Sequence, residues 1–339
     1  MMTKDGSLKR TENYNPIDAG SRPVDLTVPA GRAGLRLDQA LAGMLPEYSR
    51  SRLAQWVRAG RVTLDGRTVQ PRQKVREGDR IRVLAVPDAA ATAHGAETIP
   101  LDVVFEDGTL LVVDKPAGLV VHPGSGNWQG TLLNALLAHA PALAAIPRAG
   151  IVHRLDKDTS GLLVVAKTLA AQTDLVRQLQ ARTVKREYLA VAHGRVARDG
   201  KVDAPIGRHP VTRTKMAIVV RGRQAVTHYQ VLERYAHATL LRCRLETGRT
   251  HQIRVHLASI RHPLVGDPAY GKRSSGIAFP RQALHAERLG LIHPRTGKPM
   301  NWHAESPADL RDLIESLRDA DAPKKPDSRF TTHDSRRTK

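Results

Sequence analysis

The most distinctive group of ionisable side chains lies in residues 153–161, HRLDKDTSG, between two apolar stretches. His153, Arg154, Asp156 and Asp158 fall where an apolar segment leaves the expected core, and loops at strand ends often carry function. Two carboxylates two residues apart could also serve as an acid and base pair, as in the hydrolysis of glycosidic bonds. The same residues fit a plain hairpin turn whose polar side chains cap their own backbone.

A second group lies in residues 245–257, LETGRTHQIRVHL. On a helix, His251 and Arg254 are three residues apart and share a face. His251 and His256 are five apart, which differs from the i, i+4 spacing of a helical metal-binding pair, so we predict no metal site. A solvated basic helix is the alternative interpretation of Arg249 and its neighbours.

The elements that position these groups belong to a large domain, residues 99–318. Six apolar or alternating segments predict strands, at 110–116, 149–153, 162–167, 186–194, 226–234 and 238–246. Three segments predict helices, at 131–139, 169–182 and 251–258. The hairpin spacings and the irregular placement of helices predict an α+β domain with a mostly antiparallel sheet.

Residues 34–86 predict a second, smaller unit with two helices followed by a small sheet. An apolar stripe over 37–44 predicts one helix, and Ser49 can cap another. Gly-containing dipeptides at 65–66 and 78–79 indicate hairpin turns between short strands. Four arginines crowd the second helix and its exit: Arg50, Arg52, Arg58 and Arg61. Cations along one edge of such a unit can lie against a phosphate backbone, so we expect these arginines to bind RNA.

The remaining segments are polar and lack periodicity. We expect a flexible tail at 1–33, an Ala-rich linker at 87–98 and a disordered basic tail at 319–339. No apolar stretch is long enough to span a membrane, and the N-terminus carries acids but no apolar signal region.

The bulk composition narrows the class of partner. A net charge of +20 and a pI near 10.7 indicate a polyanionic partner, for which nucleic acid is the usual candidate in a soluble protein. The single cysteine, Cys243, lies in an apolar run and can form no internal disulfide, which suits the reducing cytosol. We therefore expect a cytoplasmic protein that acts on or binds nucleic acid, with no membrane partner.

Four ordered segments resemble one known family. HRLDKDTSGLLVVAK (153–167) closely resembles the catalytic motif of the RluA family of pseudouridine synthases, and ETGRTHQIRVHLA (246–258) resembles its later motif. EDGTLLVVDKPAGLVVHPG (106–124) resembles its first motif, and residues 35–66 resemble the S4 RNA-binding domain that precedes the catalytic domain in many members. The resemblance extends from about residue 35 to residue 318.

The resemblance implies roles for individual residues. Asp156 matches the catalytic aspartate, and Arg154 matches the arginine that helps displace the target base from the RNA. Tyr188, in REYLAV, matches the active-site tyrosine that stacks on the base, and Arg254 matches the arginine that pairs with the aspartate. It assigns no catalytic role to His153 or Asp158. We also expect two basic residues of the later motif to contact RNA, Arg249 and His251.

The resemblance also implies a reaction and a substrate. Pseudouridine formation breaks the N1–C1′ bond of uridine and rejoins the base through C5, so no atom is lost and neither a redox cofactor nor a metal is required. The sequence is most similar to the branch that modifies large-subunit ribosomal RNA, the RluD type, so we expect ribosomal RNA, in an assembling large subunit, as partner of a monomeric enzyme. The alternative is a non-catalytic S4-type RNA-binding or ribosome-assembly protein.

Overall fold

The computed structural model describes residues 22–46, 48, 50–85, 95–123, 127, 129–212, 214–271 and 276–321. The chain divides into two compact units, Met1–Thr92 and Ala93–Lys339. Each unit has its own apolar core.

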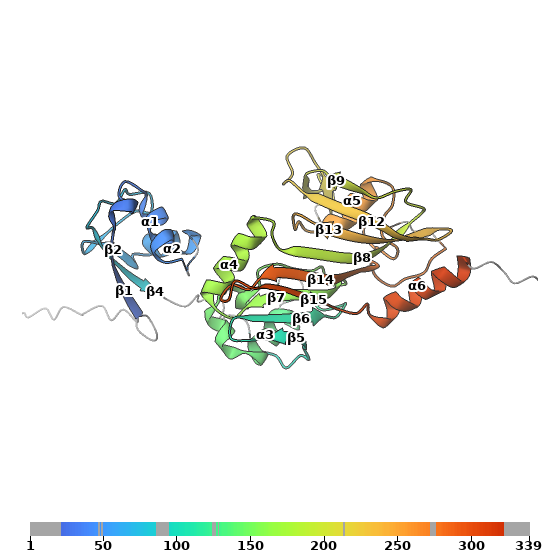
Figure 1. The fold of residues 1–339 in the computed structure, drawn as a ribbon, viewed down its shortest axis with the longest axis horizontal. Coiled ribbons are helices and arrows are strands. Elements are labelled where there is room, and N and C mark those ends of the chain that lie inside the picture. The colour runs from blue at the N-terminus through green and yellow to red at the C-terminus, as the bar shows by residue number, and fades with distance from the viewer. Residues whose placement is uncertain are drawn as a thin grey trace, which may run out of the picture. The chain divides into compact units, whose positions relative to one another are not determined.

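The first unit is a four-stranded antiparallel sheet packed against two helices (Figure 1). Its sheet order is β1-β4-β2-β3, with β1 at Arg22–Thr27, β2 at Val62–Leu64, β3 at Arg67–Thr68 and β4 at Arg80–Ala85. The helices are α1, Leu37–Met44, and α2, Arg50–Arg58, and a short 3-10 turn, η1, spans Ala30–Arg32.

The two helices form where their apolar stripes predict them. Leu37 and Leu41 on α1 and Leu53 on α2 are fully buried against the sheet residue Val83. The turn between β2 and β3 has positive φ angles at Asp65 and Gly66 (49° and 76°), as a two-residue hairpin requires. Ser49, the expected cap of α2, lies outside the described residues.

Two expectations for this unit are wrong. Part of the expected tail at 1–33 is β1, which pairs antiparallel with β4 from Arg22 opposite Ala85 to Thr27 opposite Arg80. The run from Val24 to Val28 alternates apolar and polar residues, and Val28 is 1% exposed, so this segment completes the sheet. The second expected hairpin is also absent from the described residues, because the turn at Gly78 leads into β4 from a segment that forms only an isolated bridge, Arg36 to Lys74.

The second unit is built on a nine-stranded sheet, mostly antiparallel as predicted. The strand order is β5-β6-β7-β14-β8-β13-β12-β9, and β15 pairs with β14; β14 and β7 form its parallel pair. These strands are β5 Asp102–Glu106, β6 Leu110–Lys115, β7 Ser160–Ala166, β8 Lys185–His193, β9 Gly200–Asp203, β12 Val226–Arg234, β13 Ala238–Leu245, β14 Leu284–Ile292 and β15 Pro299–His303. A separate hairpin joins β10, Ile206–Arg208, to β11, Met216–Ile218.

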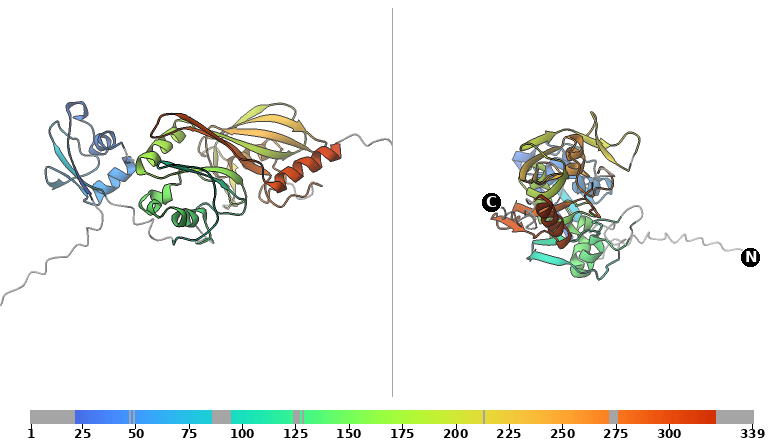
Figure 2. Two further views of the ribbon diagram at one scale, coloured as in Figure 1. Left: turned by 60° about the horizontal axis from the view of Figure 1, so that its bottom comes forward. Right: turned by 90° about the vertical axis from the view of Figure 1, so that its right-hand side faces the viewer.

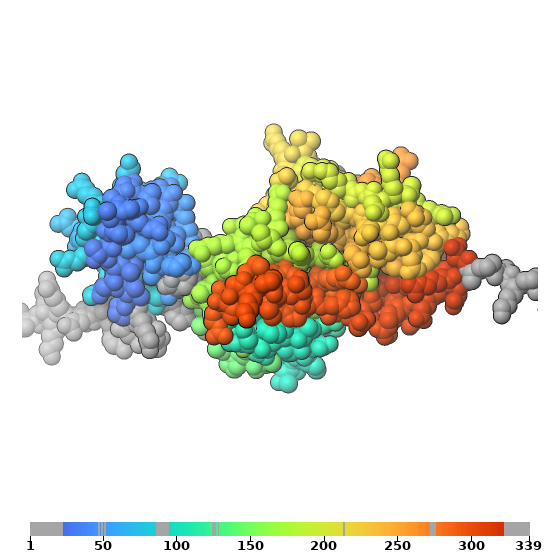
Figure 3. All heavy atoms as spheres, in the orientation of Figure 1, coloured from blue at the N-terminus to red at the C-terminus, as the bar shows by residue number. Residues whose placement is uncertain are grey.

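Helices cover both faces of this sheet (Figure 2). The face that carries Leu163 and Tyr188 packs against α3, Leu132–His139, and α5, Gln252–Ser259, together with the 3-10 turns η3, Pro141–Ala145, and η4, Pro147–Gly150. The opposite face packs against α4, Leu169–Gln180, and α6, Ala308–Asp321. Figure 3 shows β14, β15 and α6 as one band between the β5–β6 and β12–β13 regions.

The predicted helices of this unit are confirmed, and one predicted strand is wrong. Thr168 caps α4 by accepting the Ala171 N–H at 3.1 Å. Residues 149–153 form no strand: Ala149 and Gly150 belong to η4, and Ile151 makes only an isolated bridge to Val165. Gly150 has φ 78°, and a Cβ there would lie 1.9 Å from the carbonyl oxygen of Ala166, so the chain must turn before it can pair.

The expected linker and C-terminal tail are described only at their edges. Residues 86–94 and 322–339 lie outside the described residues. The end of the expected linker is attached to the second unit, since Asn134 Nδ2 donates to the Gly95 carbonyl at 2.7 Å and the Gly130 N–H donates to Glu97. The helix α6 continues to Asp321, three residues beyond the expected domain boundary.

Candidate active site

Asp156 lies in a turn that precedes β7. The Thr159 N–H donates to the Asp156 carbonyl at 3.1 Å and closes this turn. The turn ends where β7 meets β14 in parallel, with Gly161 opposite Ala286. Gly161 has φ 114°, and a Cβ there would lie 2.3 Å from the Ala286 carbonyl oxygen, so only glycine permits this close approach. We name residues 152–159 the Asp156 loop.

A buried lysine fixes the Asp156 loop from one side. Lys115, at the end of β6, is 1% exposed, and its ammonium donates to the carbonyls of Lys157 (2.9 Å), Pro116 (2.7 Å) and Leu119 (3.0 Å). Burial lowers the pKa of Lys115 to about 8. The Gly118 N–H donates to the same Lys157 carbonyl at 3.0 Å, so the residue after Asp156 is held by two donors.

An arginine fixes the loop from the other side. Arg281 Nη1 donates to the Asp158 carbonyl at 3.1 Å, and its Nε and Nη2 bind the Asp309 carboxylate of α6 at 2.7 and 2.9 Å. The next residue, Gln282, donates to the Thr159 hydroxyl at 3.1 Å. The position of the Asp156 backbone therefore depends on β6, on the segment before β14 and on α6.

The predicted pair of Asp156 and Arg254 is present. Arg254 Nη1 on α5 donates to Asp156 Oδ2 at 3.0 Å, although the two residues are 98 positions apart. Arg254 also binds Asp267 with two hydrogen bonds, from Nε at 2.7 Å and from Nη2 at 2.9 Å. Burial disfavours the Arg254 cation, but the bonds to Asp267 outweigh burial and raise its pKa. The guanidinium is thus charged and held in one orientation.

Asp267 is in turn held by the backbone. The Ala269 and Tyr270 N–H groups donate to its Oδ1 at 2.8 and 3.0 Å, and its side chain is fully buried. Burial raises the pKa of this carboxyl, but the hydrogen bonds and the charge of Arg254 lower it by more than burial raises it. The Asp267 carboxyl therefore stays ionised. Asp156 is the exposed partner of this network, with 15% of its side chain accessible.

His251 faces the other oxygen of the Asp156 carboxylate. Its Nε2 lies 3.9 Å from Asp156 Oδ1, and its backbone has φ 55°, an unusual left-handed conformation, where α5 begins. Its Nδ1 lies 2.9 Å from the Tyr270 hydroxyl, and that oxygen already accepts the Met216 N–H at 2.8 Å. The hydroxyl proton is then available to Nδ1, so these partners assign the ring proton to Nε2. Burial lowers the pKa of His251, which favours this neutral form.

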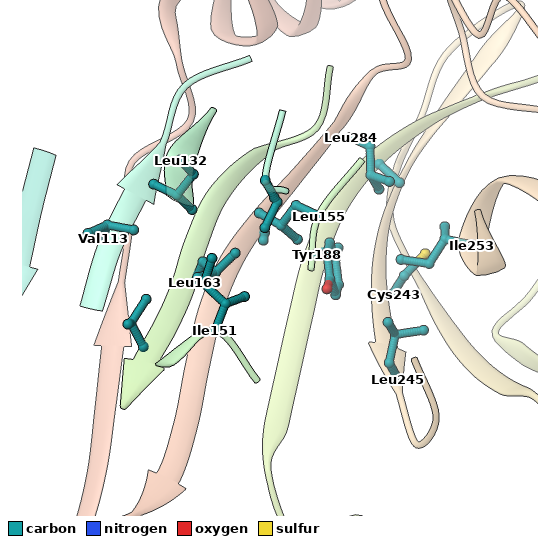
Figure 4. Close-up of a cluster of buried hydrophobic side chains, with 14 of the residues drawn as sticks. Val113, Leu132, Ile151, Leu155, Leu163, Tyr188, Cys243, Leu245, Ile253 and Leu284 are labelled. Atoms are coloured by element: carbon teal, nitrogen blue, oxygen red, sulfur yellow. The ribbon is translucent and has the colours of Figure 1, made fainter. Parts of the chain in front are cut away.

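Tyr188 lies on β8, in the same apolar cluster as the Asp156 loop residue Leu155. Figure 4 shows its ring between Leu155 and Cys243 of β13. Burial raises the pKa of Tyr188, and the nearby Arg186 opposes that change. A neutral phenol with an apolar ring is suited to stacking on a base; it is a weak base itself.

The other residues of the two predicted groups differ in their exposure to solvent. Arg154 is an exposed residue of the Asp156 loop, whereas His153 accepts the Val164 N–H at 3.1 Å and burial lowers its pKa to about 3. Arg249 is half-buried, and its Nε donates to the Gln224 carbonyl at 3.1 Å.

The four arginines of the first unit are near or in α2. Arg50 binds Asp38 of α1 at 2.9 Å, and Arg52 lies 5.2 Å from the centroid of the Trp56 ring. Arg58 is exposed and Arg61 is half-buried. The structure thus brings together Asp156, Arg254 and His251 in the second unit, while these arginines belong to a unit with a separate core.

Four residues that hold the site were not identified from the sequence: Lys115, Asp267, Tyr270 and Arg281. Lys115 ends an apolar strand, Asp267 and Tyr270 lie in HPLVGDPAYG, and Arg281 begins RQALHA, but nothing local indicates that they bind α5 or the Asp156 loop. Within the residues that the structure describes, no group of three or more His, Cys, Asp or Glu side chains could hold a metal ion. In the same part of the chain no helix is long and apolar enough to cross a bilayer.

Comparisons with known proteins agree with this geometry. A family model described as RNA pseudouridylate synthase matches residues 109–259, and a model described as S4 domain matches residues 35–81. The chain is 58% identical over 302 residues to "Ribosomal large subunit pseudouridine synthase D" of Nitrosomonas europaea, which covers 87% of this chain and 88% of that protein. The protein of the same name from Xanthomonas campestris is 52% identical over 323 residues, with 92% and 97% covered.

Solved structures give the same result. "Human RNA Pseudouridylate Synthase Domain Containing 4" has a TM-score of 0.51 and 27% identity, and covers 64% of this chain and 93% of its own. The matched residues 109–259 contain Asp156, Tyr188 and Arg254. The chain therefore belongs to the RNA pseudouridylate synthase family, with an S4 domain before the synthase domain.

Proposed function

We propose that this protein isomerises uridines of large-subunit ribosomal RNA to pseudouridine, with Asp156 as the catalytic carboxylate. The observation that carries the proposal is the partly exposed Asp156 carboxylate, held by an arginine that a second, fully buried carboxylate orients. The substrate follows from the curated relatives, whose names specify the ribosomal large subunit.

The reaction needs an anion beside the sugar of the target uridine. The N1–C1′ bond breaks, the base turns, C5 bonds to C1′, and the proton that leaves C5 is balanced by one gained at N1. An ionised carboxylate can attack the sugar or stabilise the positive charge that develops there, and Arg254 keeps Asp156 in place for either role. The chemistry of uridine therefore requires a fixed anion beside the sugar, a pocket in which the base can turn, and an acceptor for the proton that leaves C5.

The target base must also leave its stack in the RNA, which costs a few kcal/mol and least in a loop. Tyr188, whose buried ring lies close enough to Asp156 to feel its charge, would stack on the base, and Arg154, exposed on the Asp156 loop, would occupy the space that the base leaves. The two contacts would offset the cost of unstacking. Arg249 and His251 complete the proposed RNA contacts of this unit.

The first unit is proposed to bind RNA and not to take part in the chemistry. The S4 match at residues 35–81 includes the four arginines around α2, and exposed arginines supply salt-sensitive contacts to phosphates. We propose the boundaries 34–86 and 99–318 for the two domains, with β1 added to the first. An assembling large subunit as the natural substrate, and action as a monomer, belong to the same proposal.

Mapping of modified sites tests the proposed substrate. Ribosomal RNA from cells that lack this protein is treated with carbodiimide, and stops of reverse transcription are compared with those of wild-type cells. We expect stops to disappear from large-subunit RNA alone, and to return when the wild-type gene, but not Asp156→Asn, is restored. Loss of sites only in small-subunit or transfer RNA would contradict the proposal.

The alternative, a non-catalytic RNA-binding or assembly protein, makes a different prediction in the same experiment. Asp156→Asn would then restore ribosome assembly as well as the wild-type gene does, and no site would change. The presence of Asp156, Tyr188 and Arg254 in one site favours the enzyme.

A further inference from the structure

Arg186 is a buried cation for which the mechanism above has no use. It lies on β8 two residues before Tyr188, on the same face of the sheet, and is 6% exposed. Within the described part of the chain no carboxylate lies within 4.0 Å of its guanidinium, and its Nε is sealed from solvent without a hydrogen-bond partner. Its terminal nitrogens also donate to no described residue but are not sealed in this way.

The surroundings of Arg186 do not compensate its charge. A Cβ on Gly248 would lie 2.6 Å from Arg186 Nη1, so the guanidinium fits directly beneath the backbone that leads to Arg249 and His251. The groups that its charge affects are Tyr188, His153 and Arg249, of which none is acidic. Burial lowers the pKa of Arg186, as expected for a cation without a counter-ion.

Arg249 lies near three other guanidinium groups, and Arg186 is one of them. Burial lowers the pKa of Arg249, and the charges of Arg223, Arg182 and Arg186 lower it further. Glu246 is the carboxylate that pairs with a member of this group, since it accepts from Arg182 at 3.2 Å, and it also binds His228 at 2.6 Å. Arg186 is the buried member of this group, and a buried cation without a counter-ion, beside further positive charge, indicates that an anion from outside the chain binds here.

We propose that Arg186 and Arg249 form a phosphate-binding subsite, which takes a backbone phosphodiester of the RNA next to the target uridine. This inference rests on the proposed function, and it assigns the contact that holds the strand while the base is turned. A planar guanidinium can give two parallel hydrogen bonds to a phosphate, and the missing side chain at Gly248 leaves room for its terminal nitrogens. A phenolate of Tyr188 does not supply the anion, because burial keeps that hydroxyl protonated.

A buried cation that waits for its ligand has a diagnostic property. Its replacement by an apolar residue of similar length removes an uncompensated charge from the free protein, so the fold is expected to become no less stable. A structural arginine behaves in the opposite way, because its removal breaks native contacts. Arg186→Met therefore distinguishes a ligand site from a structural role.

The test uses the full chain and a transcript of large-subunit ribosomal RNA. Arg186→Met is compared with Arg177→Met, which makes the same change of charge at an exposed position on α4, across the sheet. We expect Arg186→Met to unfold at the wild-type temperature or above it and to bind RNA roughly tenfold more weakly. The slope of log Kd against log salt should fall by about 0.7–0.9, the contribution of one phosphate. Arg177→Met should change the affinity much less.

Two results would overturn the proposal. If Arg186→Met unfolds at a lower temperature but binds RNA with wild-type affinity, Arg186 has a structural role. If the affinity is unchanged but turnover is slower, Arg186 acts on the reaction through its neighbour Tyr188 and does not bind a phosphate. If Arg186→Met does not fold, Arg186→Lys, which keeps the charge, takes its place. This variant should retain the slope of log Kd against log salt and lose part of the affinity for RNA. Full affinity or a reduced slope would also contradict the proposal. Tritium release by the wild-type protein reports separately on the proposed function, since the binding comparison does not depend on turnover.

Discussion

At the scale of single residues, the site is a carboxylate whose two oxygens face different partners. Arg254 Nη1 binds Oδ2 of Asp156 at 3.0 Å, while His251 Nε2 stands 3.9 Å from Oδ1. The second distance is too long for a hydrogen bond. It leaves Oδ1 available to the substrate, with a donor beside it whose direction is set by Tyr270.

This arrangement predicts that the N–H at Nε2 of His251 contributes to turnover. His251→Ala removes the donor and should lower kcat, measured at saturating RNA, by roughly tenfold, the usual magnitude for one hydrogen bond near a charge. His251→Gln keeps a donor at similar reach and should recover most of kcat. Both variants carry the same backbone strain at φ 55°, so each serves as the control for the other.

The measurement is single-turnover release of tritium from C5-labelled RNA by the three proteins, with thermal unfolding recorded alongside. Equal rates for His251→Ala and wild type would show that this donor has no part in the reaction. Equal loss in both variants would instead show that the imidazole itself, and not any donor at this position, is required.

The residues proposed to act on the substrate could be predicted from the sequence better than the residues that hold them in place. Asp156 and Arg254 are 98 positions apart, and only the resemblance to known motifs could pair them. Asp267, Tyr270 and Arg281 were missed because their partners are set by how the segment before β14 folds back onto α5, which no local pattern encodes.

At the scale of elements, apolar periodicity predicted much of the structure, but α6 was missed although it buries Leu310, Leu313, Ile314 and Leu317 at helical spacing. The helices α3, α4 and α5 and the strands β6, β7, β8, β12 and β13 form where the apolar pattern placed them. The short strands β9, β10 and β11 were missed because three or four residues carry too little pattern. The predicted strand at 149–153 failed because Gly150 and left-handed φ angles at Arg148 and Ala149 turn the chain first.

The pairing of β5 with β6 contains an unfavourable contact that predicts a pH effect. Asp102 lies opposite Asp114, and burial, followed by the charge of Asp102, raises the pKa of Asp114 to about 6 from 3.8. Between these two values the folded protein binds a proton that the unfolded chain has lost, so stability falls as the pH rises through this window. Above pH 6 the ionised Asp114 destabilises the fold.

Asp114→Asn should therefore stabilise the protein above pH 6. We expect a gain on the order of 1 kcal/mol at pH 7.5, because Asp114 is partly exposed and solvent screens the full effect of the shift. Below pH 4 the Asp114 carboxyl is neutral, like the Asn side chain that replaces it, and the variant should match the wild type. Urea unfolding of both proteins at pH 7.5 and below pH 4 measures the difference in stability, and a gain of the same size at both pH values would contradict the account.

At the scale of the whole molecule, the chain has two compact units, and we propose that the first binds RNA without taking part in the chemistry. The unit Met1–Thr92 has its own core and contains the S4 match, whereas Asp156 and all its partners lie in the other unit. Composition predicted the nucleic-acid partner through the net charge of +20. It could not locate the domain edge at β1, because that strand is stabilised by β4, more than fifty residues later.

Removal of residues 1–90 should weaken RNA binding and leave the rate of the reaction at saturating RNA nearly unchanged. We expect Kd to rise by roughly ten- to a hundredfold at 150 mM salt, with a shallower salt slope, since exposed arginines are lost. The rate at saturating RNA should stay within several-fold of the full chain. Filter binding together with single-turnover kinetics measures both, and unchanged affinity would contradict the role of the first unit.

The central claim is that the carboxylate of Asp156, and not merely a charged loop, carries the reaction. The most direct measurement is tritium release from C5-labelled large-subunit RNA by wild type, Asp156→Asn and Asp158→Asn, all at saturating RNA. Asp158→Asn is the matched control: it removes the same charge two residues away, and the Asp158 contact to Arg281 is made by its main-chain carbonyl. We predict background release by Asp156→Asn with RNA affinity retained, and release near the wild-type rate by Asp158→Asn; substantial release by Asp156→Asn would contradict the account.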